Sequence, residues 1–344
     1  MQQILNTLYV MTQNAYVHLE NDTVRIDVER EKKLQAPLHH IGSVVCLGNI
    51  MVSPALMHRL ADEGKSLVLL DQNGRFKARL EGPVSGNILL RQAQHRAAQD
   101  TEFALETAKA IVAGKLRNTR HVLLRGARET SDEDDSKRLG EIAETLSLSV
   151  KRLPFAENLD HVRGTEGDAA KNHFSVLPRL VRRDLRETFA MDGRSRRPPR
   201  DRFNALLSFF YSMLMNDCRS AAESVGLDPQ LGFLHVVRPG RAALALDLME
   251  EFRAILADRL ALTLINRGQV TADDFEAREG GAVLLRGDAR KTVVVAYQER
   301  KQEEVTHPLT GMKAPLGLMP LLQARFMARA IRGDMECYVP FLIK

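Results

Sequence analysis

The chain has 344 residues, of which 44% are hydrophobic and 27% are charged, so its composition excludes a disordered chain. Its length exceeds that of a usual single domain and predicts two domains with apolar cores. The 49 basic and 44 acidic residues leave a formal net charge of +5, which is too small to indicate a class of partner by itself.

Cysteine usage and apolar runs indicate the compartment. The three cysteines, Cys46, Cys218 and Cys337, are far apart and show no CxxC spacing. This pattern excludes a zinc ribbon and a disulfide framework and favours a reducing compartment. The N-terminus lacks a basic region followed by a long apolar run, and the longest apolar stretch, residues 205–215, is too short to cross a bilayer. We therefore expect a soluble cytoplasmic protein with neither a signal peptide nor a membrane partner.

The first ninety residues are predicted to be rich in β-structure. Residues 15–28 and 66–80 each fit a strand, a turn and a second strand, with Asn73-Gly74 in the second turn. Between these hairpins, Ser53 is predicted to cap a short helix that begins at Pro54 and stops at Gly64.

Helical periodicity dominates from about residue 87 onward. The predicted helices are residues 88–99, 103–118, 138–148, 203–226, 242–267 and 316–334, and one β pair is expected within 282–297. The polar segments 128–138 and 193–201 are predicted to be mobile loops. The fold class is therefore α+β: a small β-rich N-terminal domain, residues 1–88, precedes a larger, mostly α-helical domain, residues 89–344.

Four acids lie in the predicted helix 242–267. On a helical wheel they gather on one side, opposite a broad apolar side: Asp247, Glu250, Glu251 and Asp258. Like charges three or four residues apart destabilise a helix by about 0.2–0.5 kcal/mol per pair. An arginine, a metal ion or simply water on a solvated face can relieve this repulsion, and the spacing does not choose among them.

Two further residues are candidate metal ligands. A turn marked by glycine and proline brings His235 toward the start of the acidic helix, and imidazole with carboxylates suits Mn²⁺ while carboxylates alone suit Mg²⁺. Thr165 and Asp168 have nearly the spacing of a capping box, which predicts Glu166 in the first turn of a helix. Both residues also have structural readings: a hydrogen-bonding histidine, and an acid that the helix dipole favours.

Residues 179–202 are the most basic segment. Nine arginines against four acids give this stretch a local charge of +5. Arginine suits bidentate contact with phosphate, although a solvated helix face and a charged loop explain the same composition.

Three motifs in this order resemble one known family. They are RGTEGDAA at residues 163–170, the run from Asn204 to VGLDPQLGFLH ending at His235, and RAALALDLMEEFRAILADR at residues 241–259. With the β-rich N-terminal region, they are similar to the CRISPR-associated adaptation integrase, the first-numbered of the Cas proteins.

The resemblance implies a catalytic site with one Mg²⁺ or Mn²⁺ ion. The catalytic and metal-binding residues it implies are Glu166, His235, Asp247 and Glu250. Asp247 and Glu250 correspond to two family acids three residues apart, of which either is the direct ligand, and position 250 carries Glu where many relatives carry Asp. Glu251 is expected to point outward in a salt bridge.

The family's activity implies insertion of new spacer DNA into a CRISPR array, in antiviral defence. A 3′-hydroxyl of the incoming duplex attacks a phosphodiester of the repeat, and with water as nucleophile the same site is an endonuclease. The arginines expected to bind DNA phosphates are Arg179, Arg182, Arg183, Arg186, Arg194, Arg196, Arg197, Arg200, Arg238 and Arg241. Tyr211 and His173 are further candidates for facing DNA, with core packing as the alternative for Tyr211.

The resemblance also implies partners. The family forms a homodimer, for which the N-terminal β domain is the expected contact, and joins a small second adaptation protein in a larger integration complex. Two alternatives stay open on sequence alone: a hydrolytic nuclease acting on branched DNA, and a non-catalytic DNA-binding scaffold.

Overall fold

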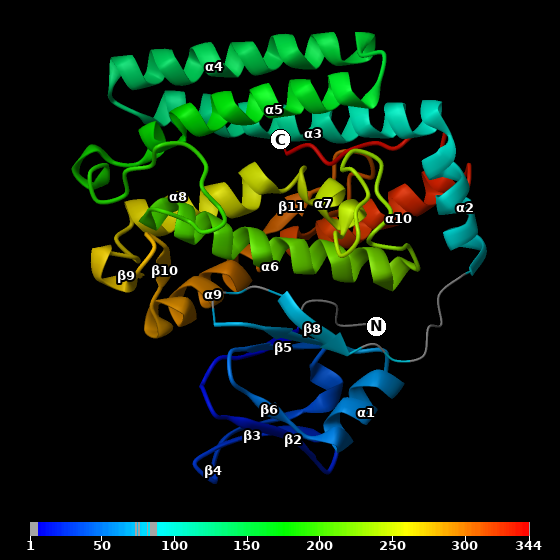
Figure 1. The fold of residues 1–344 in the computed structure, drawn as a ribbon, viewed down its shortest axis with the longest axis vertical. Helices are drawn as coiled ribbons and strands as arrows, with labels where there is room; N and C mark the ends of the chain where they lie inside the picture. Colours follow the sequence, from blue (N-terminus) through cyan, green and yellow to red (C-terminus); the bar gives the residue numbers. More distant parts are fainter. Residues whose placement is uncertain (1–5, 73, 75, 81, 83–87, 344) are drawn as a thin grey trace. The chain divides into compact units, whose positions relative to one another are not determined.

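The computed structural model describes residues 6–72, 74, 76–80, 82 and 88–343 (Figure 1). The chain divides into one compact unit of residues 1–85 and a second of residues 86–344. Strands dominate the first unit and helices the second, so the expected α+β fold class is confirmed.

The N-terminal unit is built from two four-stranded sheets and one α-helix. Its elements are β1 (Thr7–Val10), β2 (Tyr16–Glu20), β3 (Thr23–Val28), β4 (Glu31–Pro37), η1 (Leu38–His40), β5 (Ser43–Leu47), β6 (Met51–Val52), α1 (Pro54–Asp62), β7 (Ser66–Leu70) and β8 (Phe76–Leu80). The strand orders are β1-β5-β7-β8 and β4-β3-β2-β6. Apolar side chains from both sheets and α1, among them Val17, Val44 and Leu56, form one buried core.

Local signals predicted this unit well. Strands β2 and β3 pair antiparallel, as do β7 and β8, which confirms both hairpins. The Ser53 hydroxyl accepts a hydrogen bond from the amide of Leu56 at 3.2 Å, so α1 begins as predicted, and Gly64 follows with a φ of 64°. In the second turn Gly74 has a φ of 76°, while Asn73 lies outside the described residues.

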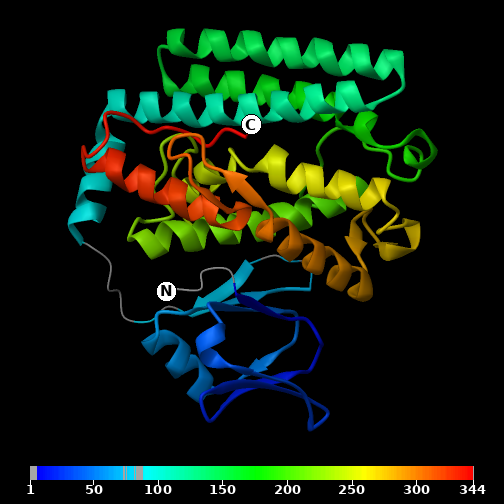
Figure 2. The same cartoon turned by 180° about the vertical axis from the view of Figure 1, so that it is seen from behind.

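The C-terminal unit is mostly helical. Its elements are α2 (Ile88–Gln99), α3 (Thr101–Glu129), α4 (Glu133–Arg152), η2 (Leu153–Phe155), α5 (Leu159–Val176), η3 (Leu177–Leu180), η4 (Arg183–Leu185), α6 (Arg202–Val225), α7 (Ala243–Met249), the π-helix η5 (Arg253–Asp258), α8 (Arg259–Asn266), η6 (Ala272–Asp274), β9 (Phe275–Ala277), β10 (Val283–Leu285), α9 (Gly287–Gln302), β11 (Glu304–Thr306), β12 (Lys313–Pro315), η7 (Leu316–Leu318) and α10 (Met319–Ile331). Helices α3, α4 and α5 pack together, each in contact with the other two, and α6 packs against α10 (Figures 1 and 2).

The predictions for segments 128–138 and 282–297 are wrong. The predicted loop 128–138 is mostly helical, because α3 runs to Glu129 and α4 begins at Glu133. The Asp132 side chain caps α4 by accepting from the amide of Asp135 at 2.8 Å, and an acid-rich first turn matches the helix dipole. In the region 282–297 only β10 is a strand, which pairs with β9, and its β-branched run lies in α9.

Candidate active site

The acidic stretch 242–267 is neither one regular helix nor solvated. It is divided into α7, the π-helix Arg253–Asp258 and α8. All four of its acids are at most 2% exposed: Asp247, Glu250, Glu251 and Asp258. Of the three alternatives that the spacing left open, a solvated face is therefore excluded for these acids. A buried carboxylate requires hydrogen bonds or a nearby cation, and each of these four receives partners from other elements.

Asp247 organises the loop that precedes α7. Its Oδ2 accepts hydrogen bonds from the amides of Phe233 at 2.6 Å and Leu234 at 3.0 Å. Its Oδ1 accepts from the amide of His235 at 3.0 Å and lies 2.7 Å from Nδ1 of the same residue. Gly232 lets the loop approach closely, because a Cβ there would lie 2.5 Å from Asp247 Oδ2. A single carboxylate thus holds both the backbone and the ring of His235.

The contact with Asp247 assigns the tautomer of His235. A carboxylate only accepts, so Nδ1 of the imidazole carries the proton in this contact, and the lone pair of a neutral ring is on Nε2. Nε2 lies 3.6 Å from Oε1 of Glu250. The free nitrogen therefore faces the second acid of the motif and is available as a ligand.

Glu250 and Glu166 share one buried cation. Lys115 of α3 forms ion pairs with Oε1 of Glu166 and with Oε2 of Glu250, the latter at 2.8 Å. Arg253 lies 2.9 Å from Oε1 of Glu250. Burial alone would raise the pKa of Glu250, but Arg253 and Lys115 outweigh it and lower the pKa below its usual range. Six residues together form the candidate active site and are called the active-site cluster below: Glu166, His235, Asp247, Glu250, Lys115 and Arg253.

Sequence reasoning missed both cations of this cluster. Arg253 follows Glu250 by three residues, a spacing that places their side chains together on a helix and could have revealed the pair. Lys115 lies in the apolar stretch AIVAGKL, where a lone lysine is the only signal.

Glu166 occupies a different place in its helix from the one predicted. Helix α5 begins at Leu159, where the Asn158 side chain accepts from the amide of His161 at 2.9 Å. Glu166 is therefore in the middle of α5, and the capping box proposed at Thr165 is wrong: its hydroxyl bonds the carbonyl of His161. The side chain of Glu166 is 26% exposed, so the cluster is accessible from this side.

Glu251 does not point outward, contrary to expectation. Its carboxylate is buried against the C-terminal segment, where it accepts from the amide of Phe341 at 2.7 Å, from Gln323 at 3.0 Å and from the Tyr338 hydroxyl. Burial raises the pKa of Glu251 to about 8, although these hydrogen bonds oppose part of the rise.

Asp258 contacts both Tyr211 and His173, the two residues that the sequence analysis considered as DNA contacts. The Tyr211 hydroxyl donates to Oδ1 of Asp258 at 2.7 Å, and Nε2 of the buried His173 lies 3.0 Å from Oδ2. The guanidinium groups of Arg194 and Arg253 lie 5.1 and 5.2 Å from the Tyr211 ring centroid. His173 and Tyr211 thus form a network behind the active-site cluster.

The donor set of the active-site cluster fits a divalent metal ion. Three carboxylates, from Glu166, Asp247 and Glu250, face two cations, Lys115 and Arg253, which leaves one uncompensated negative charge beside His235 Nε2. Two carboxylates with a neutral imidazole suit Mn²⁺, and the carboxylates without the imidazole suit Mg²⁺.

A second cluster of acidic residues lies at the start of α4, and ion pairs with arginines stabilise it. Within the described ranges, the acids with ligand atoms all within 4.8 Å of one another are Asp132, Asp134 and Asp135. Arginines neutralise each of them: Arg183 pairs with Asp132, Arg179 with Asp134, and both Arg179 and Arg186 with Asp135. The negative charges of Asp132, Asp134 and Asp135 are therefore neutralised by arginines of the same chain.

Half of the predicted DNA-binding arginines have partners within the protein. Besides Arg179, Arg183 and Arg186, Arg182 pairs with Asp184, and Arg194 donates to Asn204 at 2.7 Å and to Ser208 at 3.0 Å. Their role in DNA binding stays a prediction, and each has a structural role as well.

Four of the other five arginines are exposed. For Arg196, Arg197, Arg200 and Arg238, the described residues include no side-chain ion pair or hydrogen-bond partner. Arg241 is half-buried and reaches the Val236 carbonyl at 3.4 Å. The pKa of Arg241 is lowered, first by burial and then by the nearby charges of Arg238, Arg196 and Arg197, whereas Asp247 raises it. Like charges therefore gather beside the loop that carries His235.

No helix in the described part of the chain is both long and apolar enough to cross a membrane.

The arrangement of acids, imidazole and unpaired arginines is typical of enzymes that act on phosphodiesters. A family model described as "CRISPR associated protein Cas1" matches residues 8–299. The chain is 56% identical over 344 residues to "CRISPR-associated endonuclease Cas1 1" of Moorella thermoacetica, covering 100% of both chains. The protein belongs to the Cas1 family, which confirms the resemblance found in its motifs.

Solved structures share the fold. A chain of a "Cas6-RT-Cas1--Cas2 complex" matches with a TM-score of 0.83 and 23% identity, covering 99% of this chain and 36% of that one. A "Casposase bound to integration product" matches with a TM-score of 0.82 and 22% identity, covering 97% and 92%.

Gly232→Ala is expected to lower the free energy of unfolding by about 1–3 kcal/mol. The added Cβ would lie 2.5 Å from Asp247 Oδ2 and 2.7 Å from the backbone carbon of Ala243, neither of which can yield easily. Urea unfolding followed by circular dichroism measures the change. Gly164→Ala is the control, because a Cβ there meets nothing within 4 Å in α5. Equal stability of the two variants would contradict the close approach.

Glu251→Gln is expected to change how stability depends on pH. The folded carboxyl titrates near pH 8 and the unfolded one near 4.5, so between these values the unfolded state binds fewer protons and the free energy of unfolding falls as pH rises. Glutamine removes this titration and still accepts from Phe341. The stability of the variant relative to wild type should therefore rise from about pH 5 to about pH 8.

Urea unfolding across this pH range measures the difference. The exposed Glu144→Gln variant is the matched control. A stability difference for Glu251→Gln that stays constant with pH would show that the Glu251 carboxyl is not held protonated.

Proposed function

We propose that this protein is a divalent-metal-dependent DNA endonuclease and integrase. It inserts spacer DNA into a CRISPR array by attack of a 3′-hydroxyl on a repeat phosphodiester. The observation that carries the proposal is the pair of carboxylates, Glu166 and Glu250, that converge from two helices on one cation beside Nε2 of His235. The endonuclease name of its relative and the integration product in the casposase structure support it.

Glu166, Glu250 and Nε2 of His235 are the residues that would hold Mg²⁺ or Mn²⁺. We assign Asp247, the other candidate ligand, a positioning role, because both of its oxygens already accept hydrogen bonds from residues 233–235. When bound, the ion polarises the scissile phosphate and stabilises the charge of the leaving 3′-oxygen.

The remaining residues of the active-site cluster set charge and orientation. Lys115 and Arg253 keep Glu250 ionised, and Asp247 keeps the proton of His235 on Nδ1. Nε2 is a ligand only in the neutral ring, in which its lone pair is free.

Incoming DNA is bound through its phosphates, since spacers differ in sequence. We assign this contact first to the exposed arginines near the His235 loop, Arg196, Arg197, Arg200 and Arg238, together with Arg241. Arg179, Arg182, Arg183, Arg186 and Arg194 then have the additional role of holding their segment through internal ion pairs and hydrogen bonds.

The quaternary assignment is part of the proposal. The N-terminal unit mediates a homodimer, the helical unit carries catalysis, and a small second adaptation protein joins two such dimers in the cytoplasm. The Cas1–Cas2 assembly named for one structural relative supports that partner.

Substitutions in the active-site cluster are expected to abolish strand joining. Glu250→Gln and His235→Ala each remove a proposed ligand and should lower the rate at least about 100-fold. Asp247→Asn disturbs only the orientation of the ring and should cost about 10–100-fold. Glu157→Gln and His161→Ala replace exposed side chains and should keep the wild-type rate.

The assay joins a 3′-hydroxyl duplex to a supercoiled repeat plasmid with Mn²⁺, Mg²⁺ or chelator, with and without the small partner. Chelator should abolish joining and leave DNA binding intact. Joining by His235→Ala at the wild-type rate would mean that the histidine is structural, and binding without joining by any form would favour a scaffold.

Arginine substitutions should separate DNA contacts from structural ion pairs. Arg196→Ala and Arg238→Ala are each expected to weaken DNA binding and to reduce the slope of log affinity against log salt by about one. Arg186→Ala leaves the buried Asp135 with one cation fewer and should mainly lower thermal stability. Fluorescence anisotropy over a salt series measures the slope. An unchanged slope for Arg196→Ala and Arg238→Ala would refute the assignment.

A further inference from the structure

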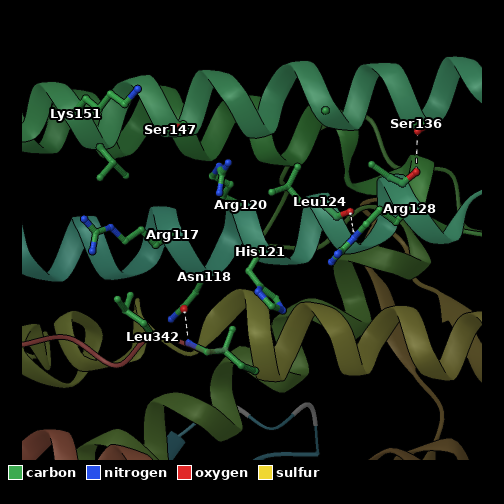
Figure 3. A pocket seen from close by; sticks show the side chains of 14 residues that line it. Arg117, Asn118, Arg120, His121, Leu124, Arg128, Ser136, Ser147, Lys151 and Leu342 are labelled. Atoms are coloured by element: carbon green, nitrogen blue, oxygen red, sulfur yellow. Dashed lines mark hydrogen bonds between the residues drawn. The ribbon is translucent and has the colours of Figure 1, made fainter. Parts of the chain in front are cut away.

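A cavity of about 780 Å³ lies in the C-terminal unit between α3, α4 and residues 342–343 (Figure 3). Its described lining includes no acidic residue and no member of the active-site cluster. This volume is in the range that accommodates a small organic ligand.

Five basic side chains line this cavity. Four come from α3 and one from α4: Arg117, Arg120, His121, Arg128 and Lys151. Among the described residues none of the five has an ion-pair partner, and the buried Nε of Arg120 has no hydrogen-bond partner. The pKa of His121 is lowered, first by burial and then by the positive charges of Arg259, Arg128 and Arg125. The cavity thus concentrates positive charge that the protein does not neutralise.

The space arises from small residues on α4. Ser136, Gly140 and Ser147 face the cavity, and a Cβ on Gly140 would meet nothing within 4 Å. Val150 of α4 and Leu342 of the C-terminal segment add apolar wall. A ligand that fits this lining carries a multiply charged anionic group and a larger, less polar portion.

We propose that this cavity binds a nucleotide, with its phosphates on Arg120 and the neighbouring cations and its nucleoside against the apolar wall. Arginine guanidinium groups bind phosphate oxygens bidentately and stack on bases. A free nucleotide and the phosphorylated end of a nucleic-acid strand offer this same chemistry. The site is separate from the active-site cluster, so it does not rest on the proposed function.

The test is calorimetric titration of the full chain in chelator, which removes divalent ions. One arm uses ADP and the other a 5′-phosphorylated DNA tetranucleotide. We expect one molecule bound per chain, with Arg120→Gln weakening binding about tenfold or more. Gly140→Met fills the space without changing charge and should weaken binding equally. Arg125→Gln is the matched control, since Arg125 lies on α3 outside the cavity and pairs with Glu129.

Each outcome decides the proposal. Tighter binding of ADP assigns the site to a free nucleotide, and tighter binding of the tetranucleotide assigns it to a strand end. No heat from either probe at about 1 mM overturns the proposal, as does binding by Arg120→Gln and Gly140→Met that matches Arg125→Gln. Thermal unfolding identifies a variant that fails to fold, in which case the other variant decides. Strand joining in Mn²⁺ tests the proposed function separately.

Discussion

The geometry of the candidate active site depends on the hydrogen bonds that the buried carboxylate of Asp247 accepts. This carboxylate takes up four hydrogen bonds from three consecutive residues, 233–235, and so converts a loop with no regular structure into a fixed platform for one imidazole. A charge without these donors would be too costly to bury at this position. The loop and the start of α7 are therefore one structural unit, and Gly232 is the residue that permits their close approach.

Charge compensation explains how so many ionised groups are buried together. Lys115 and Arg253 bring two positive charges to the carboxylate of Glu250, which is almost completely desolvated, and their attraction exceeds the penalty of burial. Removing either partner of such a pair leaves an uncompensated charge in the interior. The cluster opens to solvent at Glu166, whose side chain is 26% exposed.

The sequence predicted the elements that local chemistry determines. Ser53 with Pro54 marked the start of α1, and motif resemblance identified His235 beside the acids of α7. What it missed depends on distant contacts: Lys115 comes from a helix more than a hundred residues from Glu250, and the residues that bury Glu251 follow it by more than seventy. A helical wheel could not decide whether the acids are solvated because it assumes an isolated, regular helix, whereas this stretch is interrupted by a π-helical turn and its four acids are buried.

One turn of α3 links these distant contacts. Lys115 holds the carboxylate of Glu250, while Asn118, one turn later, donates to the carbonyls of Glu251 and Phe341, each at 2.8 Å. Two adjacent acids thus have opposite environments: Glu250 faces cations and has a lowered pKa, and Glu251 faces neutral groups of the C-terminal segment and has a raised pKa. Because both acids belong to the same break between α7 and the π-helix, the C-terminal segment fixes the backbone from which Glu250 projects. Tyr338 and Phe341 of the C-terminal segment therefore support the candidate active site through Glu251 and Asn118, without pairing with Glu250 themselves.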